Sequence, residues 1–261
     1  MSDLFRLDGA TAFVSGAAGH LGRAMSRALC EAGAHVILNG RNLGRLKDFE
    51  GELRGDGFSV ESAAFDVGDA AAVRTFFGSL KRLDVLVNNA VSMTPKPFAE
   101  LEPADFEKTY ASAVTAAFEA VRAARPALKA AAEARGEASV VNIASMYACV
   151  APDARIYARP EQASPFHYGP AKAALIQLTR HLAAELGPEK IRVNALVPGP
   201  FPQNSVASGD PAFAARLSAK TMLGRTGAAG EIAGPILFLA SKASSFVTGA
   251  ALAADGGWTA W

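Results

Sequence analysis

The sequence is poor in cysteine and has no sustained apolar run, and each shortage excludes a class of protein. Two cysteines among 261 residues cannot build a disulfide framework, and their positions match no metal-ligand spacing, so we predict no metal site. No apolar stretch is long enough to cross a bilayer. The amino terminus, with Asp3, Arg6 and Asp8, lacks the apolar core of a signal peptide. We therefore expect a cytoplasmic protein with no membrane partner.

An excess of charge is missing as well. The chain has 26 basic and 25 acidic residues, for a net charge of +1, and no block of basic residues interleaved with aromatics. This balance argues against a nucleic-acid partner and leaves a small molecule as the expected one. With 50% hydrophobic residues the chain can bury a large core, and no repeat or linker divides it. We predict one domain over residues 1–261.

Short β-like apolar runs alternate with longer helical patterns along the chain. This alternation predicts an α/β fold, a doubly wound parallel sheet of the Rossmann type with helices on both faces. The least regular stretches, 147–167 and 198–209, follow strands at the edge where open α/β sheets bind ligands. The predicted strands are 11–15, 35–39, 59–65, 85–88, 139–143, 192–197 and 252–254, and the long Ala-rich helices are 103–134 and 170–186.

A glycine-rich turn separates the first predicted strand from the first helix. Its glycines, Gly16, Gly19 and Gly22, stand where tight turning and the close approach of a pyrophosphate leave no room for a side chain. The N–H groups and the dipole at the start of the helix favour phosphates. Glycines also serve ordinary βα turns, but the strand–turn–helix setting favours a dinucleotide site that includes His20 and Leu21.

Tyr168 and Lys172 form a second candidate site. Residues four apart on a helix share one face, so the phenol and the ammonium can lie together. An ammonium about 4 Å away, at an effective dielectric near 20, would stabilise the phenolate by about 4 kcal/mol and lower the phenol pKa by about 3. Such a phenol could exchange a proton with a carbonyl or alcohol oxygen near neutral pH. The spacing also arises by chance, so the pair alone is weak evidence.

Taken together, these residues resemble the short-chain dehydrogenase/reductase family, and the likeness covers essentially the whole chain. Any one motif could arise by chance, but the ordered set is specific. The landmarks are the turn at 15–22, Asp66-Val-Gly-Asp69, Asn88-Asn-Ala90, Asn142-Ile-Ala-Ser145, Tyr168-x-x-x-Lys172, Arg192-Val-Asn194, Pro198-Gly199, Thr248-Gly249 and Asp255-Gly-Gly257.

The resemblance also implies a role for several of these residues. Ser145 would hold the substrate oxygen, Tyr168 would act as general acid or base, and Lys172 would lower the Tyr168 pKa and bind the nicotinamide ribose. The asparagines of the motifs would in part be turn residues that shape the site without touching substrate. The implied cofactor contacts beyond the glycine turn are Asp66 and Val67 at the adenine, Asn88, Asn89 and Ala90 at the ribose, and Pro198 and Gly199 beside the nicotinamide.

The end of the second strand indicates which dinucleotide binds. The family's acidic residue, which would bond the adenosine ribose and repel a 2′-phosphate, falls on Gly40. Arg41 offers a planar, permanently charged fork suited to a phosphate, with Asn42 beside it. We therefore predict NADP(H) in preference to NAD(H), with a solvated turn arginine as the alternative interpretation.

Two residues depart from the family pattern. His20 stands where the family's shorter branch has a glycine, and Gly19 supplies one a residue earlier, so we expect an altered pyrophosphate turn that still binds. Ala113 stands where an asparagine usually anchors a proton-relay water, and Ser112 is about 100° away around a helix. Either a water or another polar group completes the relay, or turnover is slow.

Two longer segments flank the predicted site. The stretch 146–167 is longer than is usual in the family, and it could wall the substrate cleft or form an oligomer contact or a solvated excursion. The segment 198–224 is predicted to form a mobile lid, with Phe201 and Met222 in its apolar cover. Candidate substrate contacts in the insertion are Tyr147, Arg155, Tyr157, Arg159 and His167.

We therefore predict an oxidoreductase, a short-chain alcohol dehydrogenase or carbonyl reductase, that reversibly reduces a ketone, sugar or 3-oxoacyl carbonyl with NADP(H). Ala113 keeps a different class open, a nucleotide-binding regulatory or assembly protein with weak or no catalysis. An enoyl reductase is less favoured, because its tyrosine–lysine spacing is usually wider. The Ala-rich helices, whose small residues permit close approach, predict a homotetramer or a homodimer.

Overall fold

The fold is one parallel sheet, and its strands match the predicted ones to within one residue at each end. The computed structural model describes residues 3–158, 163–203 and 209–261. Within these ranges seven strands pair in the order β3-β2-β1-β4-β5-β6-β7, and every pair is parallel. The strands are β1 Thr11–Val14, β2 His35–Gly40, β3 Val60–Ala64, β4 Val85–Asn88, β5 Ala138–Ile143, β6 Ile191–Pro198 and β7 Ala251–Ala254.

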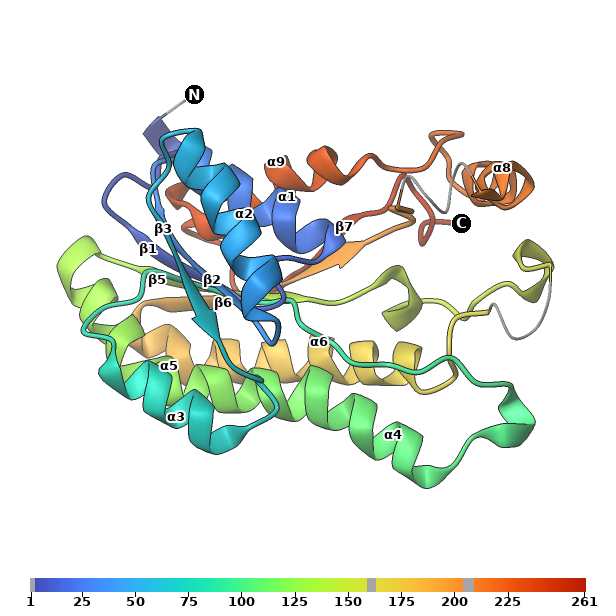
Figure 1. The fold of residues 1–261 in the computed structure, drawn as a ribbon, viewed down its shortest axis with the longest axis horizontal. Coiled ribbons are helices and arrows are strands. Elements are labelled where there is room, and N and C mark those ends of the chain that lie inside the picture. The colour runs from blue at the N-terminus through green and yellow to red at the C-terminus, as the bar shows by residue number, and fades with distance from the viewer. Residues whose placement is uncertain (1–2, 159–162, 204–208) are drawn as a thin grey trace.

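Helices cover both faces of this sheet, so the predicted doubly wound fold is confirmed. In Figure 1, α1, α2 and α9 lie on one face, α3 to α6 lie on the other, and α8 lies at one end of the molecule near the C-terminus. The helices are α1 His20–Glu31, α2 Leu43–Gly55, α3 Ala70–Ser79, α4 Pro103–Tyr110, α5 Ala116–Arg135, α6 Tyr168–Leu186, α8 Pro211–Ala219 and α9 Ala233–Ala240.

The central strands are apolar on both faces because each face meets a separate core. Phe13 and Ile37 enter the core that also holds Leu128 of α5. Their neighbours Ala12 and Val14 enter the opposite core, packed around α1 and α2. Successive side chains of a strand point to opposite faces, so a doubly covered sheet requires continuous apolar runs. This is why the strands could be located from short apolar segments.

The Ala-rich stretch predicted as one helix over 103–134 is interrupted. After α4 the chain makes a π-helical turn at Ala111–Thr115, in which Ala116 N–H bonds to the Ala111 carbonyl oxygen. The Ser112 hydroxyl bonds back to the Thr109 carbonyl oxygen at 3.1 Å, a contact that disturbs regular helix. Single π turns occur frequently at functional sites. The interruption places Ser112 beside the cleft described below.

Two kinds of site are absent from the described ranges. No helix there is both long enough and apolar enough to cross a membrane. No group of three or more His, Cys, Asp or Glu side chains is placed to hold a metal ion in the same ranges. Of the two cysteines, Cys30 is buried and Cys149 is exposed, and both are free thiols.

Candidate active site

A cleft of about 820 Å³ lies at the carboxyl edge of the sheet, where turns after several strands converge. Most of the predicted site residues line it; Asn42, Asn88 and Lys172 are not in its lining within the described part of the chain. The predicted residues that line it are Gly16, Gly19, His20, Leu21, Gly22, Arg41, Asp66, Val67, Asn89, Ala90, Ser145, Tyr168, Pro198 and Gly199.

The cleft also has lining residues that the motifs did not predict. Ser92 and Met93 directly follow the Asn-Asn-Ala motif, and that position along the chain was a signal that could have identified them. Phe201 likewise follows Pro198-Gly199 closely. The others are Asn39, Gly40, Phe65, Gly68, Val91, Lys108, Ala111, Ser112, Ile143, Ala144 and Gln203.

Two glycines make the turn after β1 possible. Gly16 has a φ of +64°, in the left-handed region where a side chain is strained. A Cβ on Gly22 would lie 2.1 Å from the Gly16 carbonyl oxygen, so only glycine lets α1 come this close to the turn. Gly19 caps the helix, which begins at His20. The amino-terminal end of α1 therefore borders the cleft, where its dipole favours an anion.

Ser15 joins β1 to β4 beneath this turn. Its Oγ accepts hydrogen bonds from the backbone N–H of Asn89 at 2.9 Å and of Ala90 at 3.0 Å. The Asn89 side-chain amide donates to the Ser15 carbonyl oxygen at 2.8 Å. Asn88 bonds inward to Asn142 Oδ1, 2.9 Å away. Asn89 thus satisfies a backbone group of the turn, as the turn interpretation predicted, whereas Asn88 and Asn142 lie in β4 and β5 and join these strands through their side chains.

Arg41 is exposed at the end of β2 and lines the cleft, whereas Asn42 does not line it. The Arg41 side chain is 71% exposed, and its nearest carboxylate, Asp66, is 3.8 Å away. Asn42 caps α2 instead, where its Oδ1 accepts from the backbone N–H of Arg45 at 3.0 Å. An asparagine at this position satisfies an open N–H of the helix, and the role of Asn42 as a cofactor contact stays a prediction.

Ser145 and Tyr168 meet in the cleft from two different elements. Ser145 follows β5, and its Oγ accepts a hydrogen bond from Tyr147 N at 3.2 Å. Tyr168 is the first residue of α6. One turn later Lys172 is only 2% exposed. Its Nζ donates to the Ile143 carbonyl oxygen at 2.6 Å and lies 5.7 Å from the centre of the Tyr168 ring.

This packing shifts the pKa values of Tyr168 and Lys172 in directions that their spacing in the sequence did not predict. Burial raises the pKa of Tyr168, and the Ser145 hydroxyl acts more weakly in the opposite direction. Burial lowers the pKa of Lys172 to about 8. The expectation that Lys172 lowers the Tyr168 pKa is therefore wrong for this arrangement. The ammonium bonds to the Ile143 carbonyl oxygen, and desolvation of the phenol is the main cause of the shift in the Tyr168 pKa.

Ala113 lies inside the π turn and is buried. It borders a small cavity, of about 10 Å³, together with Ser15, Asn88 and Ser112. Ser112 lines both this cavity and the main cleft. The π turn therefore places the Ser112 hydroxyl between the two spaces, next to the position where the family carries its asparagine.

The insertion after Ser145 packs against distant parts of the chain through an aromatic cluster, formed by Tyr147, Tyr157, Phe213 and Trp258. The hydroxyl oxygens of Tyr147 and Tyr157 are 2.6 Å apart. Tyr147 meets Trp258 edge-on at 6.4 Å, and Tyr157 lies 5.7 Å from Phe213 of α8. Burial is the main cause that raises the pKa of Tyr147, and the bond to Tyr157 adds to it. The cluster joins the insertion, α8 and the tail.

Two other candidate contacts of the insertion, Arg155 and His167, do not line the cleft. Arg155 is 87% exposed and pairs with Asp153 at 2.8 Å, and His167 is buried. Arg159 lies outside the described residues. Within the described ranges, the lining of the cleft includes no residue between Ser145 and Tyr168.

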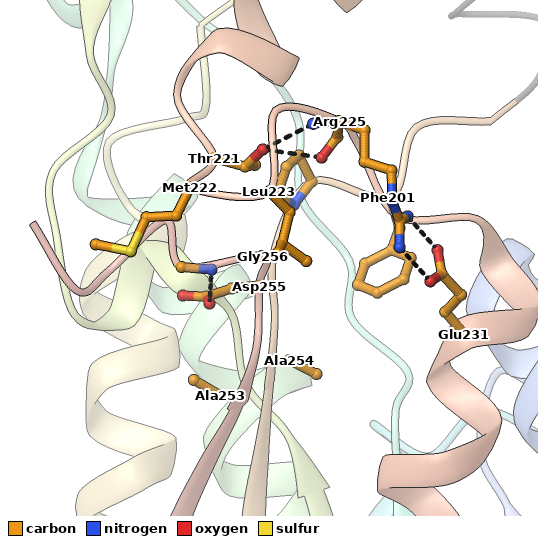
Figure 2. Close-up of a pocket in the computed structure, with 13 residues that line it drawn as sticks. Phe201, Thr221, Met222, Leu223, Arg225, Glu231, Ala253, Ala254, Asp255 and Gly256 are labelled. Atoms are coloured by element: carbon orange, nitrogen blue, oxygen red, sulfur yellow. Dashed lines mark hydrogen bonds and ion pairs between the residues drawn. The ribbon is translucent and has the colours of Figure 1, made fainter.

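Part of the predicted lid lines a second cavity of about 400 Å³, shown in Figure 2. Phe201 lines both spaces. Arg225 makes two contacts of 2.7 Å with the Glu231 carboxylate, and the Thr221 hydroxyl accepts from Arg225 N at 3.1 Å. These bonds fix the chain just beyond the segment 198–224. Residues 204–208 of that segment lie outside the described residues, and its role as a lid stays a prediction.

Comparison with known proteins gives matches over nearly the whole chain. A family model described as Enoyl-(Acyl carrier protein) reductase matches residues 16–259. The chain is 34% identical to the gluconate 5-dehydrogenase of Gluconobacter oxydans (strain 621H), over 98% of this chain and 97% of that protein. It is also 34% identical to the rhamnolipids biosynthesis 3-oxoacyl-[acyl-carrier-protein] reductase of Pseudomonas aeruginosa, over 99% of each.

A solved structure agrees with these relatives. The gluconate 5-dehydrogenase from Burkholderia cenocepacia J2315 in complex with NADP and tartrate has a TM-score of 0.86 at 33% identity, over 99% of this chain and 98% of that one. The predicted resemblance, drawn from the order of the motifs, is confirmed by these matches. The chain belongs to the short-chain dehydrogenase/reductase family and is an NAD(P)-dependent oxidoreductase.

Proposed function

We propose that the protein reversibly reduces a carbonyl of the ketone, sugar or 3-oxoacyl type to an alcohol with NADP(H). The observation that carries the proposal is a shared space: Ser145 and Tyr168 line the same cleft as the glycine turn and Arg41. A dinucleotide, with its pyrophosphate between an adenosine and a reactive ring, fits such a cleft, because the turn favours the pyrophosphate and Ser145 and Tyr168 line the same space.

The reaction assigns one task to each side chain. The dinucleotide supplies the hydride that joins the carbonyl carbon. Ser145 would hold the carbonyl oxygen by a hydrogen bond, and Tyr168 would give that oxygen its proton during reduction and take it back during oxidation. Lys172, whose pKa is about 8, is mainly charged at pH 7 and would orient the tyrosine ring from beneath.

The preference for NADP(H) over NAD(H) rests on the end of β2. Gly40 has no carboxylate that would repel a 2′-phosphate, and Arg41 extends into solvent with 71% of its side chain exposed. The related structure from Burkholderia cenocepacia contains NADP. Both observations support NADP(H), and NAD(H) binding at lower affinity is compatible with them.

The substrate is tested with the purified protein and NADPH against matched carbonyl classes. Simple ketones, keto sugars and keto sugar acids, and 3-oxoacyl thioesters are assayed in three separate arms. The last two arms follow the names of the relatives, a gluconate 5-dehydrogenase and a 3-oxoacyl-[acyl-carrier-protein] reductase. Turnover in one arm, lost in Tyr168→Phe, would support the proposal and name the class. An enoyl thioester forms a further arm, since the matching family model is described as an enoyl reductase.

The second candidate function is binding of NADP(H) for regulation or assembly without efficient chemistry. The buried Ala113 favours it, because no amide side chain stands where the family anchors its relay. Tight NADPH binding without turnover in any arm would support this function and overturn the first. The prediction of a homodimer or a homotetramer rests on the Ala-rich helices, and size-exclusion chromatography with light scattering tests it.

A further inference from the structure

His167 directly precedes Tyr168 and is almost fully buried, with 1% of its surface exposed. Its Nδ1 lies 2.9 Å from Thr109 Oγ1, and its Nε2 lies 3.3 Å from the Thr94 carbonyl oxygen. The ring meets Phe106 nearly edge-on, with centroids 5.9 Å apart. An imidazole with both nitrogens bonded and its ring packed is held in one orientation.

The partners of His167 belong to the loop between β4 and α4 and to α4 itself. The Thr109 hydroxyl also lies 3.3 Å from the Ser92 carbonyl oxygen. Ser92 is bonded a second time to Ser112, whose Oγ accepts from Ser92 N at 3.0 Å. Ser92 lines the cleft, as does its neighbour Met93. The loop is therefore held on one side by Ser112, through Ser92, and on the other by His167, through the Thr94 carbonyl oxygen.

The hydrogen atoms available to His167 and Thr109 determine which group donates in each hydrogen bond. A carbonyl oxygen only accepts, so Nε2 must carry the hydrogen that bonds to the Thr94 carbonyl oxygen. In the neutral ring Nδ1 is then an acceptor. The Thr109 hydroxyl donates its hydrogen bond to Nδ1, at 2.9 Å, because the Ser92 carbonyl oxygen is farther from it, at 3.3 Å. The imidazole thus links a donor on α4 to an acceptor on the cleft loop.

We propose that His167 is a positioning residue, which clamps the cleft loop at 92–94 to the end of α6 that carries Tyr168. The inference rests on the proposed function, since the place of the phenol relative to the loop affects turnover only if the phenol reacts. Misplacement by about 1 Å can lower a rate about 100-fold even when it originates away from the reacting atoms. Loss of the clamp therefore lowers kcat while the dinucleotide still binds.

Two matched pairs of variants test the clamp. Thr109→Val removes the hydroxyl and keeps the shape, and Thr109→Ser keeps the hydroxyl. His167→Phe removes both ring nitrogens, and His167→Gln keeps a donor for the Thr94 carbonyl oxygen. Thr109→Val and His167→Phe should lower kcat at least tenfold with KM for NADPH within threefold, while the two conservative variants stay within threefold of wild type. A kcat within twofold in folded Thr109→Val would overturn the proposal, whether or not His167→Phe folds.

A second measurement separates this inference from the reaction itself. Hydrogen exchange of the amides at 91–95, followed by mass spectrometry, does not depend on turnover. Thr109→Val should speed that exchange about tenfold, and Thr109→Ser should leave it unchanged. If exchange is faster in Thr109→Val but the wild-type protein turns over no substrate, the clamp is supported and the proposed reaction is rejected. Unchanged exchange in Thr109→Val would reject the clamp even in an active enzyme.

Discussion

The two ends of the cleft are built from different parts of the chain. At the phosphate end the turn is made of backbone, and Gly22 cannot accept even a Cβ. At the catalytic end the groups are buried side chains, with Ser145 7% exposed and Lys172 2% exposed. Steric fit therefore controls the first end, while desolvation controls the second. Substitutions at the two ends should fail in different ways, in binding at one and in rate at the other.

Tyr168→Phe should give the largest effect and define the catalytic end. Removing the hydroxyl removes the proton donor, so kcat should fall about 1,000-fold or more. The ring that packs on Lys172 remains, so the dissociation constant for NADPH should stay within about threefold of wild type. Steady-state kinetics and fluorescence titration measure the two quantities. Full activity in this variant would remove Tyr168 from the mechanism.

Lys172→Met tests how far the buried Lys172 ammonium supports turnover and how much its burial lowers the unfolding free energy. The kcat value should fall about 100-fold. Burial lowers the pKa of Lys172 from 10.5 to about 8, so between these values the unfolded chain binds more protons than the native one. The stability of the wild type should therefore rise with pH across this window. We expect the unfolding free energy, wild type minus variant, to increase by about 2 kcal/mol from pH 7.5 to pH 10.

Urea unfolding of both proteins at the two pH values measures this difference. Lys81→Met is the matched control, because Lys81 is exposed and its ammonium is solvated in both states. It should show no comparable change between the two pH values. If Lys172→Met behaves like Lys81→Met, the charge of Lys172 is not desolvated in the native state.

Gly22→Ala should break the phosphate end with no change in catalytic groups. The added Cβ would lie 2.1 Å from the Gly16 carbonyl oxygen, so the turn must shift, and NADPH should bind at least about tenfold more weakly. Gly51→Ala is the control within a helix, where a Cβ meets nothing within 4 Å. That variant should gain about 0.5–1 kcal/mol of stability and keep its affinity. Equal affinities in the two variants would contradict the steric account.

Arg41→Ala should give the smallest and most selective effect. Loss of the guanidinium should weaken NADPH binding about tenfold, because one charged hydrogen bond to an exposed phosphate is lost. NADH has no 2′-phosphate, so its affinity should change by less than twofold and serves as the internal control. Parallel titrations with both dinucleotides decide between the phosphate role and a solvated turn arginine.

How far the sequence predicts this molecule depends on how local each feature is. The strands follow from short apolar runs, and the turn follows from glycines that alone adopt its backbone conformation, so both were located from sequence. The π turn was missed because the bonds between Ser112 and Ser92 depend on tertiary structure. The direction of the Tyr168 pKa failed for the same reason. Spacing places Lys172 near the ring, but only the packed structure reveals which group is desolvated.

The aromatic cluster has a consequence for engineering. Tyr147, Phe213 and Trp258 come from three segments that are far apart in the chain, and α8 is further tied to the insertion by a bond from Arg216 to the Ile156 carbonyl oxygen. A chimera that takes the insertion from a relative without its α8 and tail would leave these surfaces mismatched. The three segments therefore pack as one unit, and a chimera should keep the stability of its parents only when all three are exchanged together.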